Sequence, residues 1–257
     1  MTAILKIGLL VFALDFSVIV VAQDSIQSKM YSWQKPVHIT NRNILSATLF
    51  EGSAHDMSYM QMSANTLMPS KGKIKLTVPA NEERLLFIKT GVLSISIGDS
   101  SRSIGRGSVV LLLPNEKYSL QSGKDSCSYY MMNYHSKSPI SKEKRKEQGS
   151  MVIDWNKVAF KPHDRGGIRN FFERPTAMCR RLEIHVTTLN EGIKSHEPHR
   201  HRAEEIVLVI DNKTEMQIAD AFHKGNTGDL YYLGSNVSHA IRNDGKGQCI
   251  YYAIQFE

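Results

Sequence analysis

The chain has 257 residues, enough for two domains of ordinary size, each with its own core. Its 32 basic and 25 acidic residues give a net charge of +7, but no helix-turn-helix, zinc-finger or RNA-recognition signature accompanies that charge. A nucleic-acid-binding protein is therefore not indicated. Cys127, Cys179 and Cys249 are an odd number of cysteines, so no disulfide framework is implied, although one bridge with one thiol left over stays open.

The first 22 residues have the character of an export signal. Lys6 precedes an apolar run, and Val20 and Ala22 are placed as the small residues before a cleavage site. Asp15 interrupts the run, which argues against a permanent membrane span because a span needs about 20 uninterrupted apolar residues. We expect residues 1–22 to be a signal peptide. The mature protein is then exported, either periplasmic or secreted, with no stable membrane span after signal cleavage.

Short β-strand patterns follow one another through the rest of the chain. They are rich in β-branched and aromatic residues, several alternate with polar residues, and Gly, Asn, Asp and Ser turns separate them. The clearest patterns cover residues 60–65, 84–88, 92–97, 108–113, 181–186, 206–210, 216–219 and 249–254. No stretch has the pattern of a long amphipathic helix. The sequence therefore predicts an all-β protein of sandwich or barrel type.

The chain matches itself at an offset of 122 residues, which becomes 121 after a one-residue deletion. The aligned pairs include Trp33 with Trp155, Phe50 with Phe172, Glu83 with Glu205, Gly107 with Gly228 and Tyr118 with His239. An offset that is steady over roughly a hundred residues indicates a duplicated domain. We expect a first barrel over residues 30–137, a polar linker over residues 138–150 and a second barrel over residues 151–257.

Two histidine-containing motifs of the second repeat have the spacing of one metal site. His199 and His201 are two residues apart, so on a β-strand both imidazoles point to the same face, and Glu205 keeps that parity. His239 follows a Gly and Asn bend, where Asn236 can adopt a left-handed backbone. Three imidazoles and a carboxylate suit one borderline divalent ion such as Mn, Fe(II), Ni, Co or Zn, and they exclude a soft thiolate site.

These motifs resemble those of the cupin superfamily, small double-stranded β-helix barrels that hold a metal in the barrel mouth. The first motif is residues 199–205, His-x-His with Glu four residues on, and the second is residues 228–239, Gly with His eleven residues on. The usual Pro-x-Gly of the second motif is replaced by residues 234–236, Gly-Ser-Asn. With the repeat, the resemblance implies two tandem cupin jelly-roll barrels, a bicupin.

The first repeat lacks the imidazoles of the second. At the aligned positions it has Thr77, Pro79, Glu83 and Tyr118, so only the carboxylate is kept. One carboxylate without an imidazole holds a transition metal poorly. We therefore expect one ion per chain and a metal-free first barrel that serves as a structural partner, a homodimer surface or a wall of the second pocket.

Four protein ligands leave positions on the ion open for water or a small-molecule substrate, which is typical of a catalytic site. Arg181, Glu183 and His185 share one face of their strand and are candidate catalytic residues if that face lines the barrel. An outward, solvated face is the alternative. His196 is expected at the barrel mouth rather than as a fifth ligand, and Gln217, Tyr251 and Gln255 are weaker candidates for substrate contacts.

Among bicupins with one metal site, the layout resembles the group that includes (S)-ureidoglycine aminohydrolase. That group has an altered ligand order, whereas this chain has the ordinary set of three His and one Glu, so the resemblance is one of layout. It implies a metal-dependent hydrolase or lyase acting on a small organic acid, amide or sugar acid. Two alternatives stay open: an iron or copper dioxygenase similar to quercetin dioxygenase, and a noncatalytic exported cupin that binds a ligand.

Overall fold

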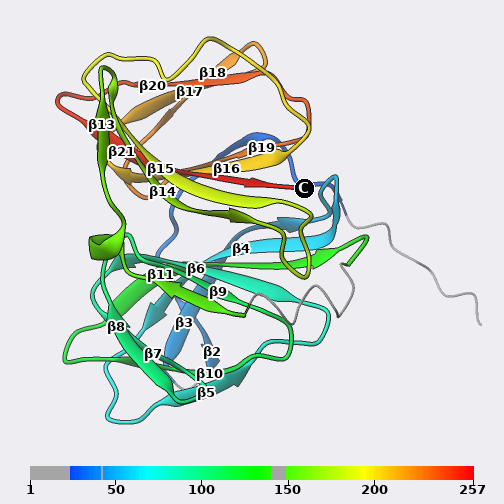
Figure 1. Ribbon diagram of the computed structural model, residues 1–257, viewed down its shortest axis with the longest axis vertical. Coiled ribbons are helices and arrows are strands. Elements are labelled where there is room, and N and C mark those ends of the chain that lie inside the picture. Colours follow the sequence, from blue (N-terminus) through cyan, green and yellow to red (C-terminus); the bar gives the residue numbers. More distant parts are fainter. Residues whose placement is uncertain (1–23, 42, 140–148) are drawn as a thin grey trace, which may run out of the picture.

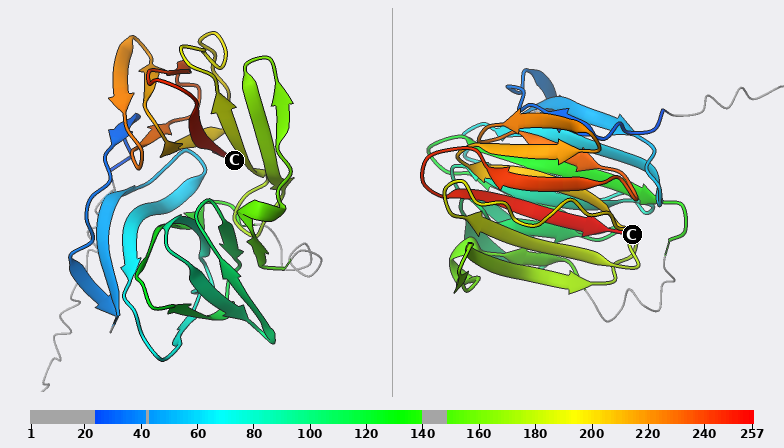
Figure 2. Two further views of the ribbon diagram at one scale, coloured as in Figure 1. Left: turned by 90° about the vertical axis from the view of Figure 1, so that its left-hand side faces the viewer. Right: turned by 90° about the horizontal axis from the view of Figure 1, so that it is seen from above.

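The computed structural model describes residues 24–41, 43–139 and 149–257. These residues form four antiparallel sheets and one short 3-10 helix, which confirms the predicted all-β class (Figure 1). One seven-stranded sheet and one smaller sheet make each of two barrels, and the two larger sheets face each other at the centre of the molecule (Figures 1 and 2). The predicted signal peptide and residues 140–148 of the predicted linker lie outside the described residues. No helix in the described ranges is long and apolar enough to cross a membrane.

The first barrel combines a larger sheet of order β12-β9-β6-β11-β4-β3-β2 with a smaller sheet of order β5-β10-β7-β8. The strands of the larger sheet are β2 (His38–Asn41), β3 (Ile44–Gly52), β4 (Met57–Leu67), β6 (Glu83–Thr90), β9 (Val109–Leu112), β11 (Cys127–Ser136) and β12 (Met151–Ile153). Those of the smaller sheet are β5 (Ile74–Thr77), β7 (Leu93–Ile97), β8 (Ser100–Ile104) and β10 (Lys117–Ser122).

The second barrel repeats this plan with the sheets β1-β19-β16-β21-β15-β14-β13 and β18-β17-β20. The strands of the larger sheet are β1 (Lys29–Tyr31), β13 (Lys161–His163), β14 (Gly166–Arg174), β15 (Leu182–Leu189), β16 (Glu204–Asp211), β19 (Leu230–Leu233) and β21 (Cys249–Phe256). Those of the smaller sheet are β17 (Thr214–Ile218), β18 (Ala221–Gly225) and β20 (His239–Asn243). The helix η1 (Trp155–Lys157) precedes β13, and the Asp154 side chain caps it by accepting from the Asn156 N–H at 3.0 Å.

The two barrels exchange edge strands. β1 lies near the start of the chain but pairs with β19 of the second barrel, where Lys29 is opposite Tyr232. β12 follows the linker but pairs with β9 of the first barrel, where Met151 is opposite Leu111. The domain boundaries expected from the sequence stay a prediction, and sheet pairing crosses them at both places.

Alternating side chains divide the core into three apolar layers. On β16, Ile206 and Leu208 belong to the layer between the barrels, whereas Val207 and Val209 belong to the interior of the second barrel. Strand β6 divides its side chains in the same way between the central layer and the interior of the first barrel. Because a strand points successive side chains to opposite faces, each larger sheet is buried on both sides. Burial of the central layer therefore holds the barrels together as one body.

The three cysteines are all buried and free. Burial raises the pKa of the Cys127 thiol to about 12 and that of the Cys249 thiol to about 11, and it also raises the pKa of Cys179. The disulfide that the sequence left open is not formed.

Two buried carboxylates tie each barrel to a loop of the other. Glu83 of β6 accepts hydrogen bonds from the Tyr134 hydroxyl at 2.8 Å, from the Thr176 hydroxyl at 2.8 Å and from the Ala177 N–H at 2.6 Å. Burial raises the pKa of the Glu83 carboxyl above its usual range, although these hydrogen bonds act in the opposite direction.

Glu204 of β16 makes the corresponding contacts from the second barrel. It accepts from the Tyr232 hydroxyl at 2.5 Å and from the His55 N–H at 2.8 Å. Glu83 and Glu204 are therefore counterparts in the duplicated fold. The sequence alignment had instead placed Glu83 opposite Glu205.

Candidate metal centre

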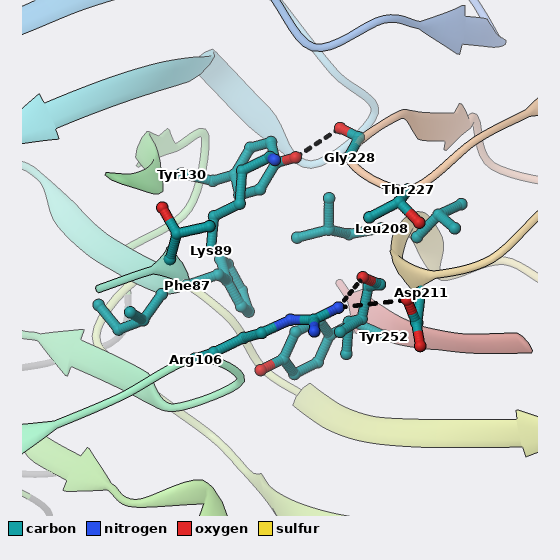
Figure 3. Close-up of a pocket in the computed structure, with 13 residues that line it drawn as sticks. Phe87, Lys89, Arg106, Tyr130, Leu208, Asp211, Thr227, Gly228 and Tyr252 are labelled. Atoms are coloured by element: carbon teal, nitrogen blue, oxygen red, sulfur yellow. Dashed lines mark hydrogen bonds and ion pairs between the residues drawn. The ribbon is translucent and has the colours of Figure 1, made fainter. Parts of the chain in front are cut away.

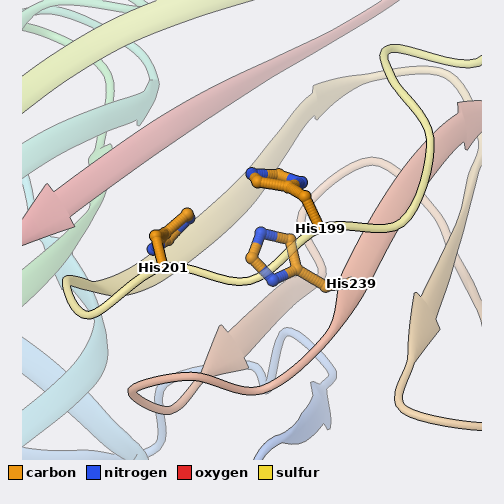
Figure 4. A group of neighbouring side chains, drawn as sticks. All are labelled: His199, His201 and His239. Carbon is orange, nitrogen blue, oxygen red and sulfur yellow. The ribbon is translucent and has the colours of Figure 1, made fainter.

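The four predicted ligands come together at the mouth of the second barrel, where Figure 4 shows the three histidines. His199 and His201 lie in the segment before β16, Glu205 lies in β16, and His239 begins β20. The His199 N–H donates to the His239 carbonyl at 3.1 Å and the His239 N–H donates to the His199 carbonyl at 2.9 Å, so a single β-bridge joins the two motifs. The prediction of one continuous strand from His199 to Glu205 is wrong, because the chain bends at residues 202–203.

The three imidazoles form a compact cluster. Their ring centroids are 4.6 Å apart for His199 and His239, 4.9 Å for His201 and His239, and 5.2 Å for His199 and His201. One ring nitrogen of each lies within 4.8 Å of one ring nitrogen of the others. Glu205 Oε2 lies 3.2 Å from His201 Nε2 and 3.4 Å from His239 Nε2. The carboxylate thus closes one side of the cluster.

Backbone carbonyl groups determine which nitrogen each ring presents to Glu205. His201 Nδ1 contacts the Ala203 carbonyl oxygen at 2.8 Å, and His239 Nδ1 contacts the Val237 carbonyl oxygen at 2.9 Å. A carbonyl oxygen only accepts, so Nδ1 carries the hydrogen in both rings and a neutral ring presents the lone pair of Nε2. The same arrangement orients metal-binding histidines in general.

The facing atoms at the centre of the cluster are mutually repulsive unless a cation lies between them. A neutral His201 or His239 offers a lone pair at Nε2, and the ionised Glu205 offers only acceptor oxygens. His239 Nε2 is buried and makes no hydrogen bond with any described residue, since its contact with Glu205 at 3.4 Å lacks hydrogen-bond geometry. Either protons or a metal ion can satisfy these atoms, so the donor set fits a divalent ion.

The pKa values of the cluster show the same attraction for positive charge. Burial alone would raise the pKa of Glu205, but the imidazoles of His201 and His239 outweigh it and hold this pKa well below its usual range. The hydrogen bond with Glu205 raises the pKa of His201. Burial, together with the neighbouring imidazole of His196, lowers the pKa of His199. The cluster therefore keeps the Glu205 carboxylate ionised and favours positive charge beside it, as a cation site does.

A cavity of about 190 Å³ opens beside the cluster inside the second barrel. Its lining is mixed: besides ligand atoms it includes the polar Thr187, Ser195, His196 and Gln255 and the apolar Val207, Met216 and Ile241, with Tyr251. His185 also faces this cavity. His185 therefore faces the interior of the barrel, and the alternative of an outward, solvated position is excluded for this residue.

The three candidate catalytic residues form one connected network. His185 Nδ1 contacts Glu183 Oε1 at 2.8 Å, and Arg181 forms a close ion pair with the other oxygen of Glu183. Arg181 Nη1 donates to Gln255 Oε1 at 3.2 Å, and Gln255 Nε2 donates to Glu205 Oε2 at 3.3 Å. Gln255, which the sequence indicated only weakly, therefore connects this network to the cluster.

The other sequence candidates lie at the edge of the site. The His196 ring packs edge-on against His199 with centroids 4.1 Å apart, and its Nδ1 contacts the Glu197 carbonyl at 3.0 Å. It lies at the mouth, as expected. Tyr251 lines the cavity, whereas the Gln217 amide donates to the Ala219 carbonyl at 3.1 Å and does not line this cavity.

The first barrel has no comparable donors at the equivalent place. In the β6–β9 pairing Arg84 lies opposite Leu112, as Glu205 lies opposite Leu233 in the β16–β19 pairing. Arg84, and not Glu83, is thus the counterpart of Glu205, which corrects the alignment by one residue. The Arg84 guanidinium donates to the Tyr118 hydroxyl at 3.0 Å and to Glu82 at 2.5 Å. A fixed positive charge stands where the second barrel has its carboxylate.

The comparison with protein families identifies the second barrel. Residues 185–255 match the family model described as a cupin domain. This part of the second barrel is therefore similar to a cupin domain. All four candidate ligands lie within the matched residues, and the resemblance to cupins found in the sequence is confirmed at this level. Among curated proteins, none matches the chain.

Solved structures extend the likeness to both barrels. AerE from Microcystis aeruginosa is 14% identical, with a TM-score of 0.64 over 89% of this chain and 99% of that one. Protein Ylba from E. coli is 10% identical, with a TM-score of 0.68 over 95% and 98% of the two chains. Oxalate decarboxylase from Lactobacillus farciminis, solved as a formate complex, is 12% identical, with a TM-score of 0.65 over 90% and 87%. Because these likenesses cover both barrels, the chain has the fold of two tandem jelly-roll barrels that the sequence predicted.

Proposed function

We propose that the second barrel binds one divalent transition-metal ion through His199, His201, Glu205 and His239. The observation that carries the proposal is the pair of Nε2 atoms that face the Glu205 carboxylate while each Nδ1 is held by a backbone carbonyl. The buried Nε2 of His239, which has no hydrogen-bond partner among the described residues, supports it further. Mn, Fe(II), Co, Ni and Zn all suit this donor set.

We further propose that this site catalyses a metal-dependent hydrolase or lyase reaction on a small organic acid or amide. The cavity of about 190 Å³ is smaller than the roughly 300–1,000 Å³ of pockets for drug-sized ligands, which favours a substrate of few atoms. One of the similar structures is an oxalate decarboxylase with formate, an enzyme of a small carboxylic acid. When bound, the ion supplies a Lewis acid for a substrate oxygen.

In this proposal His185 is the general base or acid of the reaction. A carboxylate only accepts, so the contact with Glu183 places the hydrogen on His185 Nδ1 and leaves Nε2 free to accept a proton. Glu183 and Arg181 hold the ring in this tautomer from behind. Gln255 orients the Glu205 carboxylate. Val207, Met216 and Ile241 supply the apolar part of the cavity lining, which limits the access of water to the reacting atoms.

The test combines elemental analysis with turnover assays in the presence and absence of oxygen. Purified protein should contain one equivalent of metal and should convert a member of a panel of small dicarboxylic, hydroxy and ureido acids and amides without oxygen. His185→Gln should keep the metal and lose about 10²–10⁴-fold in kcat. The exposed His163→Gln is the matched control and should keep full activity.

Two outcomes would reject this reading in favour of the alternatives. Turnover that requires oxygen together with iron or copper would indicate a dioxygenase. Full metal content without turnover of any substrate in the panel would indicate a noncatalytic ligand-binding cupin.

We also propose, from residues 1–22 alone, that the protein is exported. Amino-terminal sequencing of protein from fractionated cells tests this. A mature chain that begins near residue 23 in the exported fraction is the expected result, and an uncleaved cytoplasmic chain would contradict it.

A further inference from the structure

A second cavity, of about 310 Å³, lies between the two barrels (Figure 3). It is separate from the histidine cluster. Glu205 is near the start of β16 and belongs to the mouth of the second barrel, whereas Leu208 on the opposite face and Asp211 at the end of the strand line this cavity. Six residues at about 3.3 Å each place Asp211 roughly 20 Å along the strand from Glu205.

The inner walls of the cavity are apolar. Phe87, Tyr130, Leu208 and Tyr252 line the cavity, and all four belong to the central layer between the barrels. The Tyr130 hydroxyl donates to the Gly228 carbonyl and the Tyr252 hydroxyl donates to the carbonyl of Gly107. Because both hydroxyls are used, the rings present only their apolar faces to the cavity.

Two cations of the first repeat, Lys89 and Arg106, lie at the mouth of the cavity, together with the Asp211 carboxylate of the second repeat. Lys89 and Arg106 come from the first repeat, and the residues at the equivalent offset of 121 in the second repeat are Ile210 and Thr227. The fold itself therefore does not require cations at these positions. Gly228, with φ +101°, gives the Lys89 side chain room, since a Cβ there would lie 3.1 Å from Lys89 Cε.

Lys89 lacks a carboxylate partner. Its ammonium lies 4.8 Å from the centre of the Trp33 ring, and no carboxylate of the described residues forms an ion pair with it. Both oxygens of the nearby Asp229 instead accept backbone N–H groups, those of Trp33 at 3.2 Å and Asn226 at 2.9 Å. Burial, and after it the charge of Arg106, lowers the pKa of Lys89. An anion beside Lys89 would relieve both effects.

Arg106 is anchored at the mouth of the cavity and keeps N–H donors that its anchoring contacts do not use. Its Nη2 donates to the Ile210 carbonyl at 2.6 Å and lies 3.5 Å from Asp211 Oδ1, and about half of each of these two charged side chains is exposed. A guanidinium has five N–H donors, so this anchoring leaves others for a ligand.

We propose that the inter-barrel cavity binds a small carboxylate that carries an apolar group. The carboxylate pairs with Lys89 and Arg106, and the apolar group packs against Phe87, Leu208 and Tyr252. The volume is at the lower end of the range for small-molecule sites, roughly 300–1,000 Å³, and combines apolar walls with a few convergent polar groups. The site does not depend on the metal proposed for the second barrel.

The test is calorimetric titration of the full chain with 3-phenylpropanoate, with the neutral 3-phenylpropanamide as the matched ligand. The carboxylate should bind, and the amide should bind about tenfold more weakly because it lacks the negative charge that pairs with Lys89 and Arg106. Lys89→Gln should weaken carboxylate binding about tenfold by the same argument. Lys124→Gln removes the same charge from an exposed turn and should leave the affinity unchanged.

His201→Ala separates this site from the metal centre, where a carboxylate could also bind. Carboxylate affinity should be unchanged in this variant. The proposal is overturned if the carboxylate does not bind, if the amide binds equally well, if Lys89→Gln has no effect, or if His201→Ala abolishes binding.

Discussion

Replacement of His201 by Ala should abolish the stabilisation of the protein by metal. His201 supplies one of the two Nε2 atoms that face Glu205, at 3.2 Å. For the wild type, metal at about 100 times its Kd stabilises the folded state by about 2.7 kcal/mol, because only that state has the site. In a protein of this size each kcal/mol raises Tm by about 2–4 °C, so we expect a rise of roughly 5–11 °C.

The variant should show little of this rise. Changes in groups that only orient metal ligands weaken binding by about 10–100-fold, and loss of a ligand should cost at least the upper value. At the same metal concentration the variant is then at or below its own Kd, which leaves about 0.4 kcal/mol, or ~1–2 °C. The comparison uses the metal-induced change in Tm, because the variant also removes a partner of the buried Glu205.

The assay is thermal unfolding of chelator-treated protein titrated with Mn, Co, Ni or Zn, with elemental analysis of the dialysed samples. His196→Ala is the control, since His196 packs against His199 but its Nδ1 is engaged with a backbone carbonyl. It should keep nearly the full rise. A His201→Ala variant that retains the rise or a full equivalent of metal would refute the ligand assignment, as would a loss of metal in His196→Ala alone.

Three further predictions follow from contacts around the two barrels. In metal-free protein, the stability contributed by the His201–Glu205 pair should be greatest between about pH 4.3 and 6.5, which are the ordinary pKa values of Glu and His. This stability is lost as pH rises through the raised pKa of His201. It is also lost as pH falls through the lowered pKa of Glu205. Denaturant titrations across pH measure this, and Glu205→Gln should flatten the profile. Tyr252→Phe should lower the free energy of unfolding by about 1–3 kcal/mol, because it leaves the buried carbonyl of Gly107 unpaired. Glu83→Gln should leave the metal content unchanged, because Glu83 contacts the loop between β14 and β15 and not the histidines.

Each of these predictions has a result that would contradict it. An unchanged pH profile in Glu205→Gln would mean that the two groups do not titrate against each other. Tyr59→Phe, at a largely exposed hydroxyl, is the control for Tyr252→Phe. If both variants lost the same free energy of unfolding, the hydrogen bond between Tyr252 and Gly107 would contribute no more than an exposed one. Loss of metal from folded Glu83→Gln protein would place the site in the first barrel.

The convergence of the four ligands was predictable because it depends on short-range spacing. Two residues separate His199 from His201, and a Gly and Asn bend precedes His239. Asn236 adopts the left-handed conformation expected of it, with φ 61°, and its N–H donates to the His201 carbonyl at 2.8 Å. The bend at residues 202–203 was not visible in the residue pattern, yet it leaves Glu205 on the correct side of β16.

The register between the repeats was not predictable, because loop lengths differ. In the first barrel the Asn115 N–H donates to the Val78 carbonyl, as the Asn236 N–H donates to that of His201. Val78 is therefore the counterpart of His201. Six positions lead from Val78 to Arg84 but only four from His201 to Glu205, and residue identity alone could not place this insertion.

Contacts between the repeats could not be predicted from the sequence either. Glu204 and Glu205 are adjacent carboxylates that point to opposite faces of one strand, and both are buried. The period of a strand indicates that only one of them can face the barrel interior, which is the signal that could have drawn attention to Glu204. The cavity near Lys89 and Arg106 joins strand ends that are more than a hundred residues apart, and no local pattern marks it.

The exchange of β1 and β12 has a consequence for how this protein can be divided. A fragment cut at the linker and starting at residue 151 would keep β12, which pairs in the other barrel, and would lack β1, which covers the edge of β19. It would also expose to water its half of the apolar layer between the barrels, and an exposed apolar surface of this kind promotes aggregation. The two barrels are therefore expected to fold and to be lost together. The barrel that carries the histidines depends for its stability on the barrel that has none at the equivalent positions.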